Sequence, residues 1–397
     1  MSRFPSSVVS VLSELVARPS VSPEADSAGT RQGEAALAAL LVERLRALGA
    51  DVGTALLAPG RPNVIAVFEP RGRAKATVLF APHLDTVGAA GMIVPPFRLT
   101  SRGGRLYARG ACDTKGPTAA LLWAFRKWTR SPGMRAAGVR WVIAATAGEE
   151  DGSLGAQSLV KAGRVAPAVH GSGGAESRRC LAVDFAVALE PTDLRVVRAG
   201  KGVFRIWIET RGRAAHGSRP ERGVNAIYRM LPLAGALERE VVPALAARRH
   251  PVLGSATLNV GIISGGRGVN VVPDTCTIGV DVRVHPNCTS ATVKRLLAEV
   301  CRREAPEAKI RVQCDLPSFV APRGDPWAQR LRRHAGRGWA TAPWFCDANI
   351  FGEAGIPSVA FGPGSMAQAH TRDEYIRRAE LEAGATAFLR FLTHGRK

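Results

Sequence analysis

The stretch TVLFAPHLDTV, residues 77–87, joins the apolar run TVLFAP (77–82) to the polar residues His83 and Asp85. An apolar run without alternation is typical of a strand that is buried on both faces of a sheet. His83 would then stand at the carboxyl end of that strand, where open α/β sheets bind their ligands. Asp85 lies two residues further on, so in an extended chain both side chains face the same side. The pair suits a metal site, although a surface histidine beside an acid is the more common case.

Three more apolar runs resemble this one, and helical patterns lie before and between the runs. The runs are NVIAVFE (63–69), VRWVIAAT (139–146) and LAVDFAVALE (181–190), and the helical patterns cover 6–17, 28–48, 117–129 and 154–161. Ser6 or Ser7 would cap the first helix, and Gly49 would end the second. Strands that alternate with helices predict an α/β sheet with helices on its faces.

The region 200–315 follows a different pattern. Its expected elements are a strand at 202–211, a helix at 224–241, strands at 256–263 and 275–285, a helix at 290–304 and a strand at 308–314. This β-α-β-β-α-β order is typical of a ferredoxin-like unit. The α/β pattern then returns, with a helix near 325–335, a strand near 357–361 and a helix at 379–393. We therefore predict a catalytic α/β domain in two segments, 1–199 and 316–397, with a smaller α+β domain inserted at 200–315.

The composition is that of a folded and basic protein. The chain has 397 residues, of which 46% are hydrophobic and 22% charged, so two domains are expected. Lys and Arg outnumber Asp and Glu by 54 to 33, which gives a formal net charge of +21. The basic residues are scattered, and aromatic residues are only 6%. We therefore favour a solvated basic surface, and a nucleic-acid-binding protein is the alternative from another class.

The cysteines and the hydropathy predict a cytoplasmic protein. Seven cysteines occur and none forms a CxxC pair, which favours free thiols in a reducing compartment. The N-terminal residues lack the apolar core of a signal peptide, because Ser10, Ser13 and Glu14 interrupt it. No apolar run approaches the roughly 20 residues that a spanning helix needs, so we expect no membrane partner.

Two motifs place carboxylates at chain turns. In ARGACDTKGPTAA, Asp113 lies between two glycines just before a helix, where the alternative is a helix N-cap. In AGEEDGS an apolar strand delivers Glu149, Glu150 and Asp151 together. Adjacent acids repel one another unless they are well solvated or bind cations. The alternative is a solvated turn, and the functional interpretation is a metal ligand beside a general base.

Two more motifs complete a mixed set of donors. Glu190 ends an apolar strand in VALEPTD, although a plain turn would also explain it. His370 follows a glycine-rich loop in FGPGSMAQAHTRDEYI; a helix cap would account for Asp373 and Glu374 but not for the histidine. Imidazoles together with carboxylates suit zinc or a related divalent ion. A serine-hydrolase elbow lacks support, because no GxSxG is present.

The motifs, taken in order, resemble those of a metallopeptidase family. They are HLDTV, GACDTKG, GEED, EPT, AHGSRP, GGRGVNVVPD, DVR and AHTRDEY. The family includes acetylornithine deacetylase, succinyl-diaminopimelate desuccinylase, aminoacylases and glutamate carboxypeptidase. The resemblance spans nearly the whole chain. It implies a catalytic α/β domain with a mixed sheet of the zinc exopeptidase type, and a lid and dimerisation domain inserted into it.

The resemblance also implies a role for each residue of the site. One divalent metal ion would have His83, Asp113 and Glu190 as ligands, and a second would have Asp113, Glu150 and His370, with Asp113 bridging. The metals of this family usually are zinc, and cobalt or manganese sometimes supports activity. Asp85 would orient His83. Glu149 would be the general base and acid that takes a proton from the nucleophilic water and gives it to the departing nitrogen.

The resemblance extends to the inserted domain and to the substrate. His216 matches a histidine that reaches the site of a partner subunit and stabilises an oxyanion, so a homodimer is expected. Asn270 and Arg283 match substrate contacts, with Arg283 suited to a carboxylate, and Gly364 would approach the substrate through its backbone. The predicted substrate is a small N-acyl amino acid, as in acetylornithine deacetylase. A dipeptidase or carboxypeptidase of the same family is the alternative.

Overall fold

The computed structural model describes residues 4–24, 33–131, 138–168, 180–335 and 337–393. These residues form two compact units. The first comprises Met1–Arg198, Val320–Ala340 and Cys346–Lys397, and the second comprises Ala199–Phe319 and Thr341–Phe345. Each unit has its own cluster of buried apolar residues. No helix among the described residues has the length and apolarity that crossing a membrane requires.

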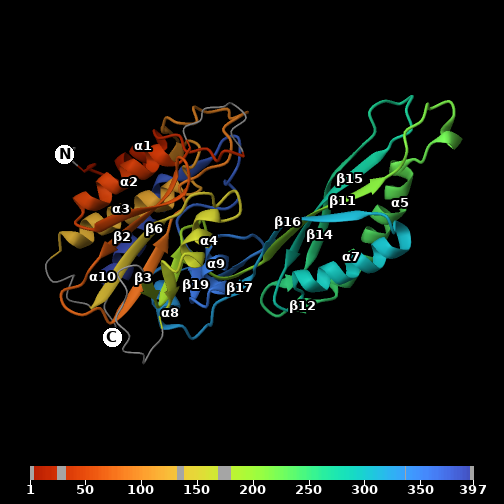
Figure 1. Ribbon diagram of the computed structural model, residues 1–397. Helices are drawn as coiled ribbons and strands as arrows, with labels where there is room; N and C mark the ends of the chain where they lie inside the picture. Colours follow the sequence, from red (N-terminus) through yellow and green to blue (C-terminus); the bar gives the residue numbers. More distant parts are fainter. Residues whose placement is uncertain (1–3, 25–32, 132–137, 169–179, 336, 394–397) are drawn as a thin grey trace. The chain divides into compact units, whose positions relative to one another are not determined.

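A mixed sheet forms the centre of the first unit (Figure 1). Its order is β1 (Asp51–Ala58), β2 (Arg61–Phe68), β6 (Val139–Ala145), β3 (Ala76–Ala81), β9 (Phe185–Ala188), β19 (Ser358–Ala360), β10 (Val196–Gly200) and β17 (Phe319–Val320), with β18 (Trp339–Ala342) also paired to β10. The four central strands β6, β3, β9 and β19 are parallel, whereas β1, β2 and β10 pair antiparallel with their neighbours. The expected mixed α/β architecture is confirmed.

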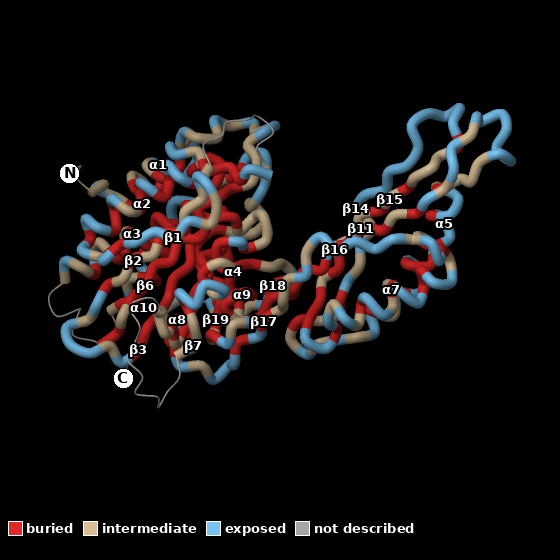
Figure 2. The backbone as a smooth tube through the Cα atoms, viewed as in Figure 1, coloured by how far each residue is buried: buried red, intermediate tan, exposed pale blue. Residues whose placement is uncertain are grey.

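Helices cover both faces of this sheet. Their bounds are α1 (Val8–Val16), α2 (Ala35–Ala47), α3 (Lys115–Thr129), α4 (Leu154–Lys161), α8 (Pro326–Ala335), α9 (Asp347–Glu353) and α10 (Arg378–Thr393). The main apolar cluster joins α1, α2, α3, α8 and α10 to alternate residues of the strands, such as Val78 and Phe80. Leu79, between them, is equally buried but lies outside that cluster. The central strands are therefore buried on both faces, as their continuous apolar runs predicted (Figure 2).

Short strands and caps complete the first unit. The strands are β4 (Thr100–Arg102), β5 (Arg105–Tyr107) and β20 (Tyr375–Arg377), which form one small sheet, and β7 (Val165–Pro167) and β8 (Leu181–Val183), which form another. The Ser7 side chain accepts a hydrogen bond from the Ser10 backbone nitrogen at 3.1 Å and caps α1. Gly49, with φ 84°, follows α2 as expected.

Two elements of the first unit differ from the sequence prediction. The run 181–190 is not one strand, because Asp184 interrupts it and its carboxylate accepts the Thr77 backbone N–H at 2.8 Å. The chain before Asp184 pairs with β7, and the chain after it joins the main sheet. The helix predicted at 28–48 begins only at Ala35, and residues 28–32 of that prediction lie outside the described residues.

The second unit is an antiparallel sheet with helices on one face. Its elements are β11 (Gly202–Arg211), η2 (Pro220–Arg222), α5 (Ala226–Ala236), η3 (Leu237–Val241), α6 (Val242–Ala246), β12 (Arg249–His250), β13 (Gly254–Ser255), β14 (Thr257–Gly265), β15 (Thr275–Val284), α7 (Ser290–Glu304) and β16 (Lys309–Leu316). The strand order β14-β15-β11-β16 is that of a ferredoxin-like unit (Figure 1). Every second residue of β15 is buried, so only one face of the sheet is covered.

The helix predicted at 224–241 is longer and less regular than expected. Regular α5 ends at Ala236, a π-helical turn follows over Leu237–Val241, and α6 continues to Ala246. Pro232, inside α5, has no N–H to donate, which is one local source of irregularity. The other expected elements of this unit are present, with ends that differ by at most two residues.

Candidate metal centre

The carboxyl ends of three parallel strands bring the first candidate residues together. His83 follows β3, Glu149 and Glu150 follow β6, and Glu190 follows β9. These strands are direct neighbours in the order β6, β3, β9, so their ends meet at one edge of the sheet. Pairing even continues past the strand ends, because His83 forms a parallel bridge with Thr146. The placement matches the edge where open α/β sheets bind ligands.

Asp113 lies between the two histidines. Its Oδ1 is 3.1 Å from Nε2 of His83, and its Oδ2 is 3.4 Å from Nε2 of His370. His370 Nε2 is also 3.1 Å from Oε1 of Glu150. Donor atoms of His83, Asp113 and Glu150 all lie within 4.8 Å of one another. Each oxygen of the Asp113 carboxylate thus faces a different imidazole, which is the geometry that a bridging carboxylate requires.

Asp85 joins the His83 strand to the acidic turn. Its carboxylate accepts the backbone N–H groups of Glu149 at 3.0 Å and Glu150 at 2.9 Å. Its backbone oxygen lies 3.0 Å from Nδ1 of His83, whereas its Oδ1 is 3.6 Å from the same nitrogen. The closer contact to the imidazole is therefore the carbonyl oxygen. Asp85 fixes the direction in which the two glutamates leave the turn.

The third acid of the turn points away from this cluster. Asp151 Oδ2 accepts a hydrogen bond from Nη2 of Arg61 at 2.7 Å, and its Oδ1 accepts one from Ser22 at 2.8 Å. The same guanidinium contacts the Glu34 carboxylate through Nε at 2.9 Å and Nη2 at 2.7 Å. Arg61 thereby neutralises Asp151, and only Glu149 and Glu150 remain for the site.

The electrostatics of the cluster show a surplus of buried negative charge. Burial raises the pKa of Glu149 and Glu190 well above the ordinary value, and nearby carboxylates raise both further. The Asp113 and Glu150 carboxylates raise the pKa of His370 to about 10, although burial opposes this. Burial also opposes the charge on Asp113, yet His370 and His83 hold its pKa well below the usual range. Two imidazoles, the buried acids Asp113 and Glu190, and the half-buried acids Glu149 and Glu150 form a donor set that fits divalent cations.

Gly364 lies beside the Asp113 segment. A Cβ on this residue would stand 2.7 Å from Sγ of Cys112, and its φ is 92°, so a side chain cannot be accommodated without movement. Its backbone oxygen accepts a hydrogen bond from Asp193 at 2.7 Å. Packing alone therefore explains the glycine.

The sequence prediction missed one neighbour of the site, Asp347. Asp347, at the start of α9, is buried; its Oδ2 accepts the Thr146 hydroxyl at 2.6 Å, and its Oδ1 has no hydrogen-bond partner among the described residues. Its charge raises the pKa of Glu149 and Glu190. Asp347 sits in WFCDANIF, a stretch without other acids or histidines, so no local pattern pointed to it.

The expectation that Glu374 caps a helix is wrong. It is not a helix cap, because β20 follows it and α10 begins only at Arg378. Instead, its buried carboxylate accepts backbone N–H groups of the Asp113 loop and pairs with Arg109, whose Nη1 is 2.7 Å away. Both residues were visible in motifs that also contain a candidate ligand, ARGACDTKG and HTRDEY.

The other candidates belong to the second unit. His216 Nδ1 contacts the Ser218 hydroxyl at 2.7 Å, and the next residue, Gly217, donates its backbone N–H to the carbonyl of Asn270 at 2.7 Å. His216 and Asn270 thus lie on two paired loops at one end of the sheet. Arg283 lies near the end of β15, and its Nε donates to Oδ1 of Asp281 at 2.8 Å.

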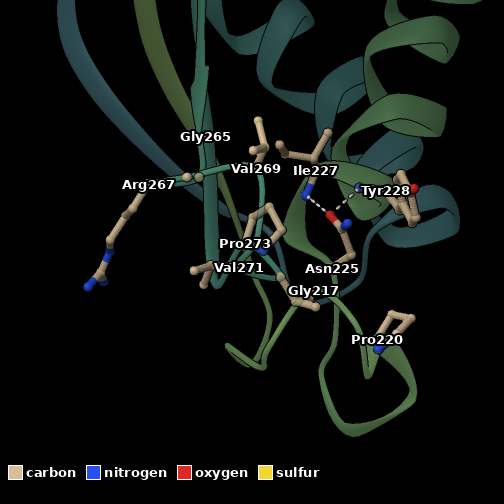
Figure 3. A pocket seen from close by; sticks show the side chains of 13 residues that line it. Gly217, Pro220, Asn225, Ile227, Tyr228, Gly265, Arg267, Val269, Val271 and Pro273 are labelled. Carbon is tan, nitrogen blue, oxygen red and sulfur yellow. Dashed lines mark hydrogen bonds between the residues drawn. The ribbon is translucent and has the colours of Figure 1, made fainter.

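A cavity of about 790 Å³ lies beside these two loops (Figure 3). Gly217 and Pro220 line it from the first loop, and Val269 and Val271 from the second. Asn225 caps α5 at its edge, and its Oδ1 accepts the Ile227 backbone N–H at 2.9 Å. The cavity wall is largely apolar.

Comparisons with known proteins agree with this geometry. Residues 79–394 match Peptidase family M20/M25/M40. Acetylornithine deacetylase of Myxococcus xanthus is 33% identical over 84% of this chain and 83% of its own, and the enzyme of that name from Proteus mirabilis is 29% identical over 93% and 92%. A metallo-carboxypeptidase of Sulfolobus solfataricus shares the fold, with a TM-score of 0.77, 18% identity and coverage of 98% and 99%.

These matches decide between the classes that the composition left open. The nucleic-acid-binding alternative finds no support in them, and the scattered basic residues need no such partner. The family resemblance of the motifs is confirmed over most of the chain. The chain belongs to peptidase family M20/M25/M40 and is a metal-dependent hydrolase of amide bonds.

Proposed function

We propose that this hydrolase removes the acyl group from a small N-acyl amino acid. The observation that carries the proposal is the Asp113 carboxylate, whose two oxygens face two different imidazoles at 3.1 and 3.4 Å. The two relatives named acetylornithine deacetylase support the substrate class, since each matches more than four fifths of the chain. A dipeptide or a C-terminal residue of a peptide is the alternative substrate, because it presents the same bond.

Two divalent metal ions are part of this proposal. His83, Asp113 and Glu190 would hold one, and Asp113, Glu150 and His370 the other. Zinc suits the mixed nitrogen and oxygen donors, and cobalt or manganese is accepted by the same donor types. When bound, such ions lower the pKa of water and polarise the acyl oxygen. His370 adopts φ 64°, a left-handed conformation that a histidine keeps only where the surroundings hold it, as occurs at functional sites.

Glu149 carries the proton in the proposed reaction. It is the neighbour of the proposed ligand Glu150, and Asp85 holds the backbone of both residues. Glu149 takes a proton from the attacking water and delivers it to the amide nitrogen as the C–N bond breaks. The products are a carboxylate and a free amine. Asp85 is a positioning residue. It orients His83 through its backbone oxygen and the two glutamates through its carboxylate.

His216, Asn270 and Arg283 are proposed substrate contacts, and their spacing supports a homodimer. His216 and Asn270 lie at the end of the second unit where β15 begins, and Arg283 lies eight residues along that strand. At about 3.4 Å per residue this is roughly 27 Å, too far for one small substrate to touch both groups. We therefore propose that His216 polarises the acyl oxygen in the site of a partner subunit. Gly364 would contact the substrate through its backbone.

The exposed edge of the second unit offers a surface for that partner. β14 pairs only with β15 among the described strands, which leaves its other edge open. Ile262 and Ile263 on this strand, and Tyr228 and Leu231 on α5, are all more than half exposed. Exposed apolar residues beside an open strand edge favour pairing with a second copy of the chain. We accordingly propose that the region 200–315 is a lid and dimerisation domain.

We also propose that the protein resides in a reducing compartment such as the cytoplasm. All seven cysteines are free thiols, and five of them are buried. Disulfides are rare where glutathione and thioredoxin keep thiols reduced. Thiol titration of protein purified with and without reductant should give the same count.

One experiment tests the substrate and the metal together. The purified protein is analysed for bound metals, and hydrolysis is then measured on N-acetyl and N-succinyl amino acids, dipeptides and N-blocked peptides. We expect two divalent ions per chain and the largest kcat/KM on an N-acyl amino acid. Preference for dipeptides would select the peptidase alternative. A protein that binds no metal under any loading condition would overturn the proposed site.

A further inference from the structure

We propose that Glu374 and Arg109 are positioning residues that set the spacing between Asp113 and His370. The proposal rests on the metal site described under the proposed function. Neither residue is a candidate ligand, and both are buried, with 1% and 3% of their surface exposed. They connect two segments that are more than 250 residues apart in sequence.

Glu374 holds the backbone of the Asp113 loop. Its Oε1 accepts the N–H groups of Cys112 at 2.8 Å and Asp113 at 3.0 Å. Its Oε2 accepts the N–H of Gly110 at 3.0 Å and Nη1 of Arg109 at 2.7 Å. A carboxylate has about four lone-pair sites, so this one is fully used. The loop precedes α3, and Glu374 supplies the acceptors that these buried N–H groups need.

Arg109 holds the segment that carries His370. Its Nη1 lies 3.3 Å from the carbonyl oxygen of Thr371, directly after the histidine. Its Nε donates to the carbonyl oxygen of Gly88 at 3.0 Å, which adds the loop that follows β3. One guanidinium thus contacts two segments of the site, and it contacts Glu374 as well. The planar fork of arginine suits such a junction, because its donors point in fixed directions.

The two segments need this connection because of the geometry at Asp113. Its carboxylate must meet one imidazole with each oxygen, and useful metal sites tolerate errors of only about 0.5 Å. The backbone N–H of Asp113 donates to the carboxylate of Glu374, which lies four residues after His370 in the chain. Two contacts fix the chain that follows His370, whose φ is 64°: Arg109 binds the Thr371 carbonyl oxygen, and the Ala108 backbone N–H donates to the Glu374 carbonyl oxygen at 3.2 Å. Weakening the contact between Glu374 and Arg109 would therefore move Asp113, the proposed bridging ligand, away from His370.

A purely structural ion pair would behave differently. Removing it would lower stability and leave the affinity of the folded protein for metal unchanged. A positioning pair lowers metal affinity in protein that is still folded, and it lowers kcat more than it raises KM. Supporting groups around metal ligands typically contribute 10- to 100-fold to metal affinity or activity.

The test uses Glu374→Gln and Arg109→Lys in the full chain. Glutamine keeps the shape of the side chain but replaces one acceptor oxygen with a donor group, and lysine keeps the charge but loses the fork. Zinc is removed by dialysis against a chelator, and its rebinding is measured by isothermal titration calorimetry, beside thermal unfolding of the metal-free proteins. We expect a loss of about 10- to 100-fold in affinity for at least one of the two ions. At saturating zinc, kcat should fall and KM should stay nearly unchanged.

Two control variants separate position from charge and stability. Asp373→Asn removes the exposed acid next to Glu374 and should bind zinc like the wild type. Glu14→Gln breaks a partly buried ion pair with Arg44, far along the chain from the site residues, and should affect unfolding only.

The outcomes keep the two proposals apart. Wild-type protein that binds no metal would refute the proposed function. Wild-type protein that binds two ions, with folded Glu374→Gln and Arg109→Lys proteins that bind them equally well, would overturn the positioning role alone. If Glu374→Gln does not fold, Arg109→Lys decides. Loss of folding in both would mark the pair as structural and would equally overturn the inference.

Discussion

Glu149 and Glu150 are neighbours in the chain, yet we assign them different tasks. Asp85 binds the backbone N–H of both, which fixes the turn. Only Glu150 meets His370, at 3.1 Å, and its donor atom belongs to the cluster with His83 and Asp113. Glu149 is half-buried beside them, and among the described residues its carboxylate forms no hydrogen bond to either histidine, which leaves it for proton transfer.

The matched variants Glu149→Gln and Glu150→Gln separate these tasks. Glu149→Gln should keep both metal ions and lose turnover by roughly 100-fold or more, because an amide cannot act as a base. Glu150→Gln should bind less metal. Metal analysis and steady-state kinetics on the same preparations make the comparison. Near-normal turnover in Glu149→Gln would exclude it as the base.

The local sequence revealed some residues of the site and not others. The proposed ligands lie in short motifs where acids and histidines follow apolar strands or glycines, so their chemistry was visible locally. Arg61 and Asp347 were not, because their partners lie 90 and 201 residues away; Glu374 was visible in a motif, but its role was not, because its partner Asp113 lies 261 residues away. Such long-range partners follow from the tertiary fold, and periodicity contains no information about them.

The second strand after α2, β2, carries a junction of buried charges. Arg61 opens β2 and forms ion pairs with both Glu34 and Asp151, whose side chains are 0% and 3% exposed. Arg61→Met would leave two buried acids without a cation, and we expect a loss of about 3–5 kcal/mol in the free energy of unfolding. Urea denaturation measures this. Arg377→Met, at an exposed pair with Glu380, should change it by less than about 1 kcal/mol. Equal effects in both variants would contradict the assignment.

The packing of α4 against the turn after β6 depends on a glycine. A Cβ on Gly155 would stand 2.5 Å from both the Ala147 carbonyl oxygen and Oδ1 of Asn63. Gly155→Ala should therefore destabilise the protein by about 1–3 kcal/mol or more, since the backbone of the GEED turn cannot yield easily. Gly53→Ala meets no atom within 4 Å and should be neutral or stabilising by up to about 1 kcal/mol. Thermal unfolding measures both variants. An unchanged stability of Gly155→Ala would show that the turn adapts to the added methyl group.

Elements with continuous apolar runs or strong helical periodicity were predictable, and edge elements were not. β3, β6 and α7 lie where the pattern placed them, within one residue at either end. The edge strand β1, DVGTALLA, lacks a regular alternation, and four of its eight residues are exposed. Its position is set by antiparallel pairing with β2, which is a tertiary contact. The split of 181–190 likewise depends on a contact, the bond from Thr77 to Asp184.

At the scale of the whole molecule, the dimer proposal makes a prediction about mixed subunits. A His216→Ala chain lacks the oxyanion group, and a Glu149→Ala chain lacks the base, so each homodimer should be nearly inactive. If His216 acts in the partner's site, a heterodimer contains one site with both groups. Random mixing should then restore roughly a quarter of wild-type activity. No recovery, with heterodimers demonstrated by native mass spectrometry, would place His216 within its own chain or outside the reaction.

The second unit enters and leaves its sheet through neighbouring strands. β11 begins at Gly202 and β16 ends at Leu316, and the register pairs Val203 with Leu316. Force applied to these two ends would load the hydrogen bonds between β11 and β16 one after another from a single end, in a peeling geometry. Single-molecule stretching across the insertion should therefore open it at low force, although the same sheet would resist far more if pulled along its strands. We therefore expect that pulling on the two chain connections of this domain unfolds it more readily than pulling along its strands does.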